Sequence, residues 1–111
     1  MEVNYKLLNK NLIVHVGEEL DHYEADKIKK LTEKMMKRGS VKNIIFHFGN
    51  TNFMDSSGVG LIIGRYKALQ NTGGKLVVTE LKPSVEKLFE LSGLLKLVYT
   101  CPNLDMAVHF V

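Results

Sequence analysis

Phe53-Met54-Asp55-Ser56-Ser57-Gly58-Val59-Gly60-Leu61-Ile62-Ile63-Gly64 is the stretch on which the prediction of the fold depends. A mostly apolar run at 44–48 precedes it and predicts a buried strand. After it, apolar residues recur at helical spacing: Val59, Ile62, Ile63, Tyr66 and Leu69. The stretch is therefore expected to join a strand to a helix, with one aspartate and two serines where the helix begins. Free backbone N–H groups and the positive end of the helix dipole favour an anion at such a place.

The composition is that of one globular domain. The chain has 111 residues, of which 45% are hydrophobic and 24% charged, so residues 1–111 are expected to share a single core. No apolar run approaches the roughly 20 residues that span a bilayer, and the N-terminal residues do not resemble a secretory signal. A single cysteine, Cys101, cannot form an internal disulfide. These features predict a cytoplasmic protein without a membrane partner.

Neither the basic residues nor the histidines predict binding of nucleic acid or of a metal. The net charge is +3 and the pI about 9.0, but many of the basic residues alternate with apolar ones at helical spacing between 27 and 38. This pattern is typical of a solvated helix face, and no nucleic-acid recognition motif accompanies it. The four histidines (His15, His22, His47 and His109) lack the spacing of a metal site. No metal and no cofactor are predicted.

The rest of the chain predicts an α/β fold. Residues 5–8 and 12–16 are expected to form an antiparallel hairpin. The first helix should follow Asp21, which with Glu24 has the spacing of a capping box, and should end near Gly39. Further strands are predicted at 44–48, 76–78 and 97–99, and further helices after Asp55, Lys82 and Asn103. This order predicts a mostly parallel sheet with an antiparallel edge and about four helices.

The central stretch also carries a family resemblance. Phe53 to Gly60, followed by Gly64-Arg65-Tyr66-Lys67 and by Gly73-Gly74, resembles the STAS domain of anti-sigma factor antagonists, and most strongly the antagonists of anti-sigma F factor in endospore-forming bacteria. Glu19-Leu20-Asp21-His22 resembles the family's loop after the second strand, and residues 88–94 resemble its third helix. Glu18 stands where relatives usually carry glycine, although Gly17 precedes it.

The resemblance implies a regulatory switch in sporulation and no catalytic residue in this chain. The unphosphorylated protein would bind an anti-sigma factor and release its sigma factor, expected to be sigma F. The anti-sigma factor would also be a serine kinase, which uses ATP and leaves ADP when it phosphorylates Ser56. A serine phosphatase would reverse the reaction. Residues alone do not separate Ser56 from Ser57 as the acceptor, since either could also cap the helix.

A partner-binding surface is expected around Ser56. Asp55 either assists phosphoryl transfer or caps the helix and orients the loop, and Ser57 is expected to have a structural role. The resemblance implies that Glu19 and Asp21 pair with basic residues of the kinase. Gly58, Gly60 and Gly64 lower helix propensity by about 1 kcal/mol each, and with Met54 and Leu61 they favour a bare surface for a partner over close packing within the domain. Arg65 is expected to be exposed.

Two other functions stay open at this point. The chain could antagonise a different anti-sigma kinase, such as that of the general stress response. It could also be a receiver-like domain phosphorylated on Asp55, although receivers do not begin with a hairpin. A serine hydrolase is disfavoured because Ser56 lacks the Gly-x-Ser-x-Gly context.

Overall fold

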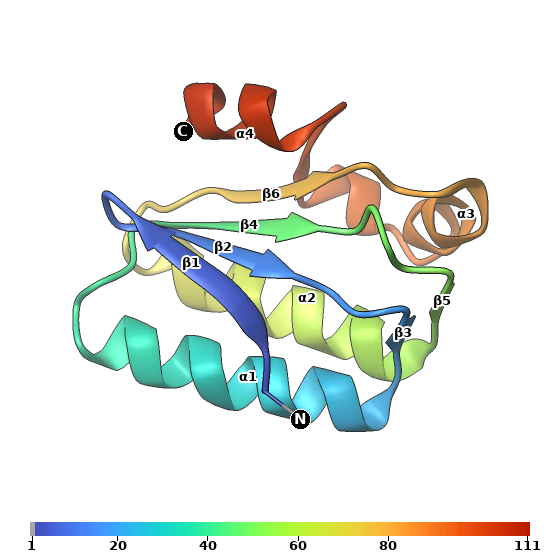
Figure 1. Cartoon of the computed structure of the whole chain (residues 1–111), viewed down its shortest axis with the longest axis horizontal. Coiled ribbons are helices and arrows are strands. Elements are labelled where there is room, and N and C mark those ends of the chain that lie inside the picture. The colour runs from blue at the N-terminus through green and yellow to red at the C-terminus, as the bar shows by residue number, and fades with distance from the viewer. Residues whose placement is uncertain (1) are drawn as a thin grey trace.

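The computed structural model describes residues 2–111 as a central sheet with helices on both faces (Figure 1). In chain order the elements are β1 (Asn4–Leu8), β2 (Asn11–His15), β3 (Glu19–Leu20), α1 (His22–Lys37), β4 (Asn43–His47), β5 (Phe53–Met54), α2 (Ser56–Gln70), β6 (Leu76–Thr79), α3 (Pro83–Leu91), a 3-10 helix η1 (Leu94–Lys96), β7 (Tyr99–Cys101) and α4 (Leu104–Phe110). Among these residues no helix has both the length and the apolar character needed to cross a bilayer.

The five main strands have the predicted topology. Their order across the sheet is β1-β2-β4-β6-β7, with β1 antiparallel to β2 and every other neighbouring pair parallel. The hairpin turns through Asn9 and Lys10, which both have positive φ. A two-residue turn needs this conformation if it is to match the twist of the two strands. The predicted α/β fold with an antiparallel edge is confirmed.

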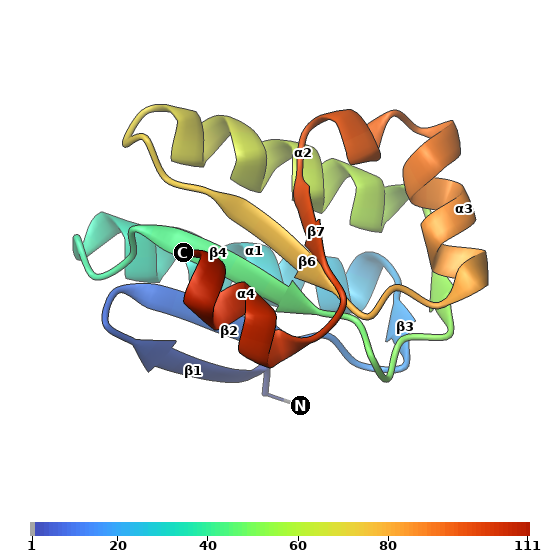
Figure 2. The same cartoon turned by 90° about the horizontal axis from the view of Figure 1, so that it is seen from above.

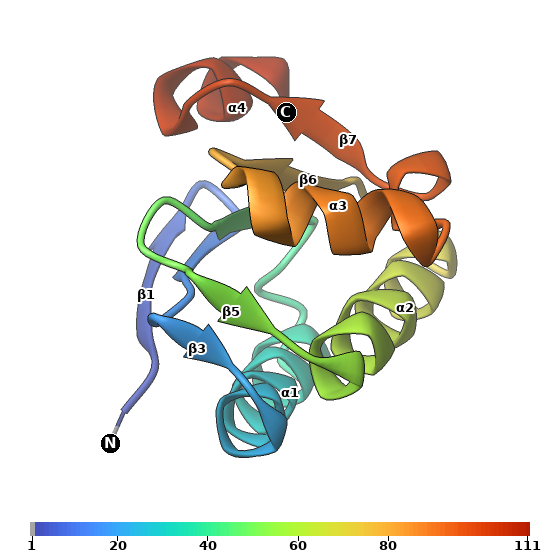
Figure 3. The same ribbon diagram turned by 90° about the vertical axis from the view of Figure 1, so that its right-hand side faces the viewer.

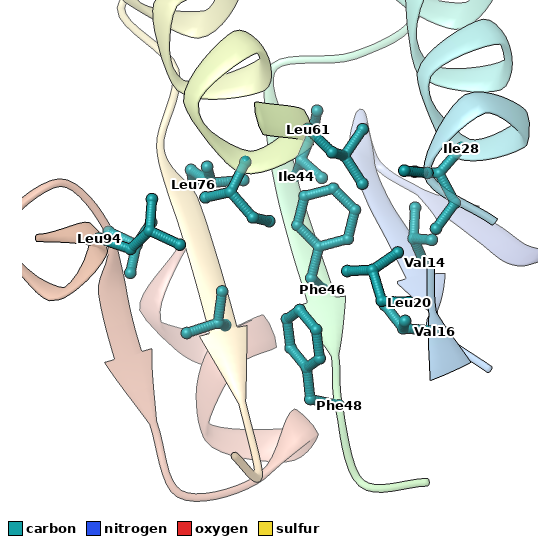
Figure 4. Close-up of a cluster of buried hydrophobic side chains, with 14 of the residues drawn as sticks. Val14, Val16, Leu20, Ile28, Ile44, Phe46, Phe48, Leu61, Leu76 and Leu94 are labelled. Carbon is teal, nitrogen blue, oxygen red and sulfur yellow. The ribbon is translucent and has the colours of Figure 1, made fainter. Parts of the chain in front are cut away.

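Strand β4 lies in the middle of the sheet, which explains its nearly continuous apolar sequence. Ile44, Ile45 and Phe46 are fully buried. Helices α1 and α2 cover one face of the sheet and α4 covers the other, as Figures 1 and 2 show from two directions. The larger core cluster, on the α1 and α2 side, includes Phe46, Phe48 and Leu20 (Figure 4). The smaller cluster, around Ile13, Ile45, Val77 and Ala107, lies beneath α4.

A second, two-stranded sheet lies beyond the end of the main sheet and was not predicted. Strands β3 and β5 pair in parallel, with Glu19 opposite Phe53 and Leu20 opposite Met54. The backbone N–H groups of Asn52 and Asp55 donate to the carbonyls of Glu18 and Leu20, at 2.8 and 3.3 Å. The loop after β2 and the loop after β4 are therefore fastened side by side (Figure 3).

Two predicted elements differ in detail. The last strand is Tyr99–Cys101 and not 97–99. The chain turns at Gly93 (φ 83°) into η1, and the N–H groups of Leu97 and Val98, just after η1, still donate to the Leu94 carbonyl and so cannot join the sheet. On α1, Asp21 caps the helix by accepting from the Glu24 N–H at 3.0 Å, as predicted. The reciprocal half of the capping box is absent, since the Glu24 carboxylate accepts from the Gly17 N–H instead.

Candidate functional site

Helix α2 begins at Ser56, and its N-terminal cap is Asp55. The Asp55 backbone is extended, and its Oδ1 accepts a hydrogen bond from the Ser57 N–H at 2.8 Å. Of the possible caps that the sequence offered, the structure has Asp55 and neither serine. Because the carboxylate does this work, the fold does not need the hydroxyl of Ser56, and that residue is exposed.

The first turn of α2 is open to a negative charge. Helices α1, α3 and α4 each have an acidic residue in the first turn (Glu24, Glu86 and Asp105), whereas α2 has none. Within α2 and its cap, Asp55 is the one acid that offsets the positive end of the dipole. An anion on Ser56 would meet favourable electrostatics within this domain.

The loop that carries Glu19 and Asp21 lies beside the start of α2, as predicted. The pairing of β3 with β5 fixes this position, since the Asp55 N–H donates to the Leu20 carbonyl. The Thr51 hydroxyl adds a second connection by donating to the Gly17 carbonyl at 2.8 Å. The Glu19 side chain is exposed, while Asp21 is half-buried in its capping role.

Three residues expected on the partner surface are buried. Met54 and Leu61 have only 7% and 6% of their surface exposed and belong to the core, because Met54 of β5 and the Leu61 side of α2 face inward. Gly58 is also buried, and a Cβ on it would lie 2.6 Å from the Met54 Cγ and 2.9 Å from the Leu20 Cδ2. Close packing, and not a bare surface, explains this glycine. A Cβ on Gly60 or Gly64 would meet nothing within 4 Å among the described residues, so these two positions alone match the expected bare strip.

Arg65 is buried, and the prediction of an exposed arginine is wrong. Only 6% of its surface is accessible, since it lies between α1 and α2. Its guanidinium donates to the Thr32 hydroxyl at 3.3 Å and reaches the Glu33 carboxylate at 3.4 Å. These residues are 32 and 33 positions from Arg65 in the chain, and no local pattern in the sequence signals the contacts.

The fold and the motif together match a known family. A model of the STAS domain family matches residues 2–108. The chain belongs to the STAS domain family. This membership removes the receiver-like alternative, with which neither the starting hairpin nor the capping role of Asp55 agrees.

Curated relatives of this STAS domain are antagonists of anti-sigma factors. It is 38% identical over 87 residues to an anti-sigma F factor antagonist of Paenibacillus polymyxa, covering 78% of this chain and 74% of that protein. It is 34% identical over 83 residues to one of Lysinibacillus sphaericus, covering 75% and 71%. An anti-sigma-B factor antagonist of Staphylococcus aureus is 33% identical over 86 residues, covering 78% and 79%.

Solved structures agree with these relatives. The unphosphorylated form of the anti-sigma factor antagonist SpoIIAA superposes with a TM-score of 0.86 at 29% identity, covering 96% of this chain and 92% of that one. The phosphorylated form of the Bacillus cell fate determinant SpoIIAA superposes with a TM-score of 0.80 at 28% identity, covering 96% of each chain. This STAS domain therefore has the same fold as both phosphorylation states of SpoIIAA.

A histidine pair lies at the ends of β2 and β4, outside the Ser56 site. The Nδ1 atoms of His15 and His47 are 3.4 Å apart, and the His47 Nε2 is 3.0 Å from the Glu80 carboxylate. Burial lowers the pKa of His15, and the neighbouring His47 lowers it further, while Glu80 opposes them. The two histidines are 32 residues apart, so the sequence alone did not bring them together. Within residues 2–111 no three His, Cys, Asp or Glu side chains form a group that could hold a metal ion.

Proposed function

We propose that this STAS domain is an anti-anti-sigma factor that is switched by phosphorylation of Ser56. The unphosphorylated chain binds an anti-sigma factor that is also a serine kinase, and this binding releases the sigma factor. The released factor is sigma F, which acts in sporulation. Transfer of the ATP γ-phosphoryl group to the Ser56 hydroxyl leaves ADP and ends the binding, and a serine phosphatase restores it. The chain acts in the cytoplasm as the substrate of these enzymes.

The observation that carries the proposal is the division of labour between Asp55 and Ser56. Asp55 caps α2, so the Ser56 hydroxyl stands exposed at the first helical position without a structural task. An exposed hydroxyl can enter a kinase active site, and its replacement by a phosphate ester breaks nothing in the fold. Ser57 is half-buried, and its N–H is held by the cap, which makes it the less accessible of the two acceptors.

Charge at the interface explains how the phosphate could end binding. A phosphoserine carries about −1.5 to −2 charges at pH 7. Within the domain this charge is favourable at the α2 N-terminus, since the first turn has no other acid. Buried against a partner without a paired cation, it costs several kcal/mol, and about 3 kcal/mol already weakens binding a hundredfold. The switch is then local repulsion and desolvation, without a large change of backbone.

The proposed docking surface surrounds Ser56. It consists of the exposed Glu19, of Asp21, Asp55 and Ser57 at the two helix starts, and of the open strip at Gly60 and Gly64. Gly58, Met54 and Leu61 support this surface from beneath.

Phosphorylation by candidate kinases tests the proposal. The protein is incubated with anti-sigma kinases and ATP, and the phosphorylated residue is identified by mass spectrometry. We expect phosphate on Ser56 only. Ser56→Ala should bind the kinase as the wild type does and resist inactivation, while Ser56→Asp should bind weakly. Phosphate on Ser57, or equal binding by the two variants, would contradict the proposal.

The choice of kinase is a separate matter. The similarity to a Staphylococcus aureus anti-sigma-B factor antagonist supports a second candidate, in which the partner belongs to the general stress response. Kinases of both systems are therefore compared for their rate of Ser56 phosphorylation. A faster reaction with the anti-sigma B kinase would favour this second candidate.

A further inference from the structure

Two hollows lie side by side along the seam between α1 and α2, whose ribbons run next to each other in Figures 1 and 3. The first, of about 360 Å³, is lined by His22, Asp26 and Lys29 from α1 and by Ser57, Gly60 and Gly64 from α2. The second, of about 800 Å³, is lined by Lys34 and Lys37 from α1 and by Ala68 from α2. Arg65 lines both. Together they are called the α1–α2 groove below.

The floor of the groove is a strip of small residues on α2 that lowers the stability of this helix. Gly60, Gly64 and Ala68 follow one another at intervals of four residues, so they share one side of α2. A glycine inside a helix costs about 1 kcal/mol relative to alanine. Apart from the neighbouring backbone of α2 itself, no described atom lies within 4 Å of the Cβ position of Gly60 or Gly64, so packing within the domain does not require either glycine. A molecule outside the domain gives a reason to keep the floor bare.

Arg65 carries a buried positive charge where the two hollows meet. Its side chain is more than nine-tenths buried, yet its Nε has no hydrogen-bond partner among the described residues. Its ion-pair partner, Glu33, keeps half of its side-chain surface exposed. A buried guanidinium with incomplete partners stabilises a fold poorly, and it provides positive charge in the middle of the groove.

The wall of the groove is basic. Lys29, Lys34 and Lys37 are exposed, and none of them is in an ion pair within residues 2–111. The two acids of the wall are already engaged, Asp26 by Lys30 at 3.0 Å and Glu33 by Arg65. The groove therefore presents free positive charge along its length and complements a negatively charged occupant.

We propose that the α1–α2 groove receives an acidic segment of the anti-sigma kinase, with its backbone on the Gly60–Gly64 strip and its carboxylates facing Lys29, Lys34 and Lys37. This inference rests on the proposed function, because the first hollow is lined by Ser57, next to the phosphorylated serine. The groove would be a second contact surface, opposite in charge to the acidic Glu19–Asp21 loop. The partner would then bind an acidic surface and a basic surface on two sides of Ser56.

Binding measurements with the kinase that phosphorylates Ser56 test the groove. Calorimetry gives the dissociation constant of the unphosphorylated full chain at low and at moderate salt. The variant Lys29→Glu/Lys34→Glu/Lys37→Glu should weaken binding at least about tenfold, and its affinity should depend less steeply on salt. The control Lys6→Glu/Lys10→Glu/Lys96→Glu alters net charge equally on exposed positions away from the groove, and should bind within about threefold of the wild type.

A second variant fills the groove without touching its charge. Gly64→Leu meets no described atom at its Cβ and gains helix propensity, so it should fold at least as stably as the wild type. We expect it to weaken kinase binding about tenfold or more.

The possible outcomes separate the two proposals. Wild-type affinity in both the lysine triple variant and Gly64→Leu, with Ser56 still phosphorylated, would overturn the groove and leave the proposed function standing. Equal weakening by the two lysine triple variants would also overturn the groove, since net charge alone would then explain the effect. Absence of Ser56 phosphorylation with every kinase would overturn both.

Discussion

Two glycines two residues apart on α2 should respond oppositely to the same substitution. Gly58 lies beneath Met54 and Leu20, while Gly60 points away from all other described atoms. The variants Gly58→Ala and Gly60→Ala each add one methyl group to the same helical turn. Their difference therefore isolates the packing of the added Cβ from its effect on helix propensity.

The magnitudes follow from the contacts. Either substitution gains about 1 kcal/mol of helix propensity. At Gly60 nothing opposes this gain, so the free energy of unfolding should rise by up to about 1 kcal/mol. At Gly58 the new Cβ would be 2.6 Å from the Met54 Cγ, an atom in the middle of a buried side chain, so Met54 must shift. Overpacking of this kind costs about 1–3 kcal/mol, and after the propensity gain of about 1 kcal/mol this leaves Gly58→Ala up to about 2 kcal/mol less stable than the wild type.

Urea denaturation followed by circular dichroism measures both free energies, and thermal melting provides a check. For a chain of this length, 1 kcal/mol corresponds to a shift in Tm of about 3–6 °C. We expect the two variants to melt on opposite sides of the wild type. A Gly58→Ala variant as stable as Gly60→Ala would refute the assignment of Gly58 to close packing and would return it to the docking surface.

Two further predictions concern the buried Arg65 and the half-buried His15. Arg65→Met keeps the aliphatic packing between α1 and α2 and removes a guanidinium whose Nε is unpartnered, so its free energy of unfolding should be unchanged or about 1 kcal/mol higher. Arg65→Ala should lose about 2 kcal/mol or more because it leaves a cavity. Urea denaturation of both variants tests this, and a large loss in Arg65→Met would show that the charge itself stabilises the fold. The lowered pKa of His15 means that the folded state disfavours its protonation, so the stability it contributes is present above the unfolded pKa of 6.5 and is lost as the pH falls below that value towards the folded pKa. Urea midpoints between about pH 7 and pH 5 should therefore fall less steeply in His15→Gln than in the wild type, and identical slopes would assign the pH dependence to other groups.

The main sheet was predictable because its signals are local. The apolar run at 44–48 and the helical spacing after Asp55 each need only a few neighbouring residues, and both predict elements that the structure contains. The hairpin was equally visible. The burial of β4 also followed, since a nearly unbroken apolar run predicts a buried strand.

The parts that were missed or wrong depend on contacts between distant residues. Strands β3 and β5 have two residues each, too few for any periodicity, and exist only because the two loops pair with each other. Arg65 looks like a solvated helical residue until Thr32 and Glu33 of α1 lie against it. Glycine gives no sequence signal that separates a buried position such as Gly58 from an open one such as Gly60, because the difference lies in which neighbours the fold brings to the missing Cβ.

The start of α2 is built with less stability than the chain could give it. Its first turn contains two serines and a glycine, the only acid at its start is the Asp55 cap, and Gly60 and Gly64 follow without a packing reason. A phosphate on Ser56 would add a second negative charge, worth about 0.3–1 kcal/mol or more at a helix N-terminus. Phosphorylation would therefore strengthen the very helix that docks. If the phosphorylated chain nevertheless fails to bind, the loss has to arise at the surface shared with the partner, because no weakening of the domain is available to explain it.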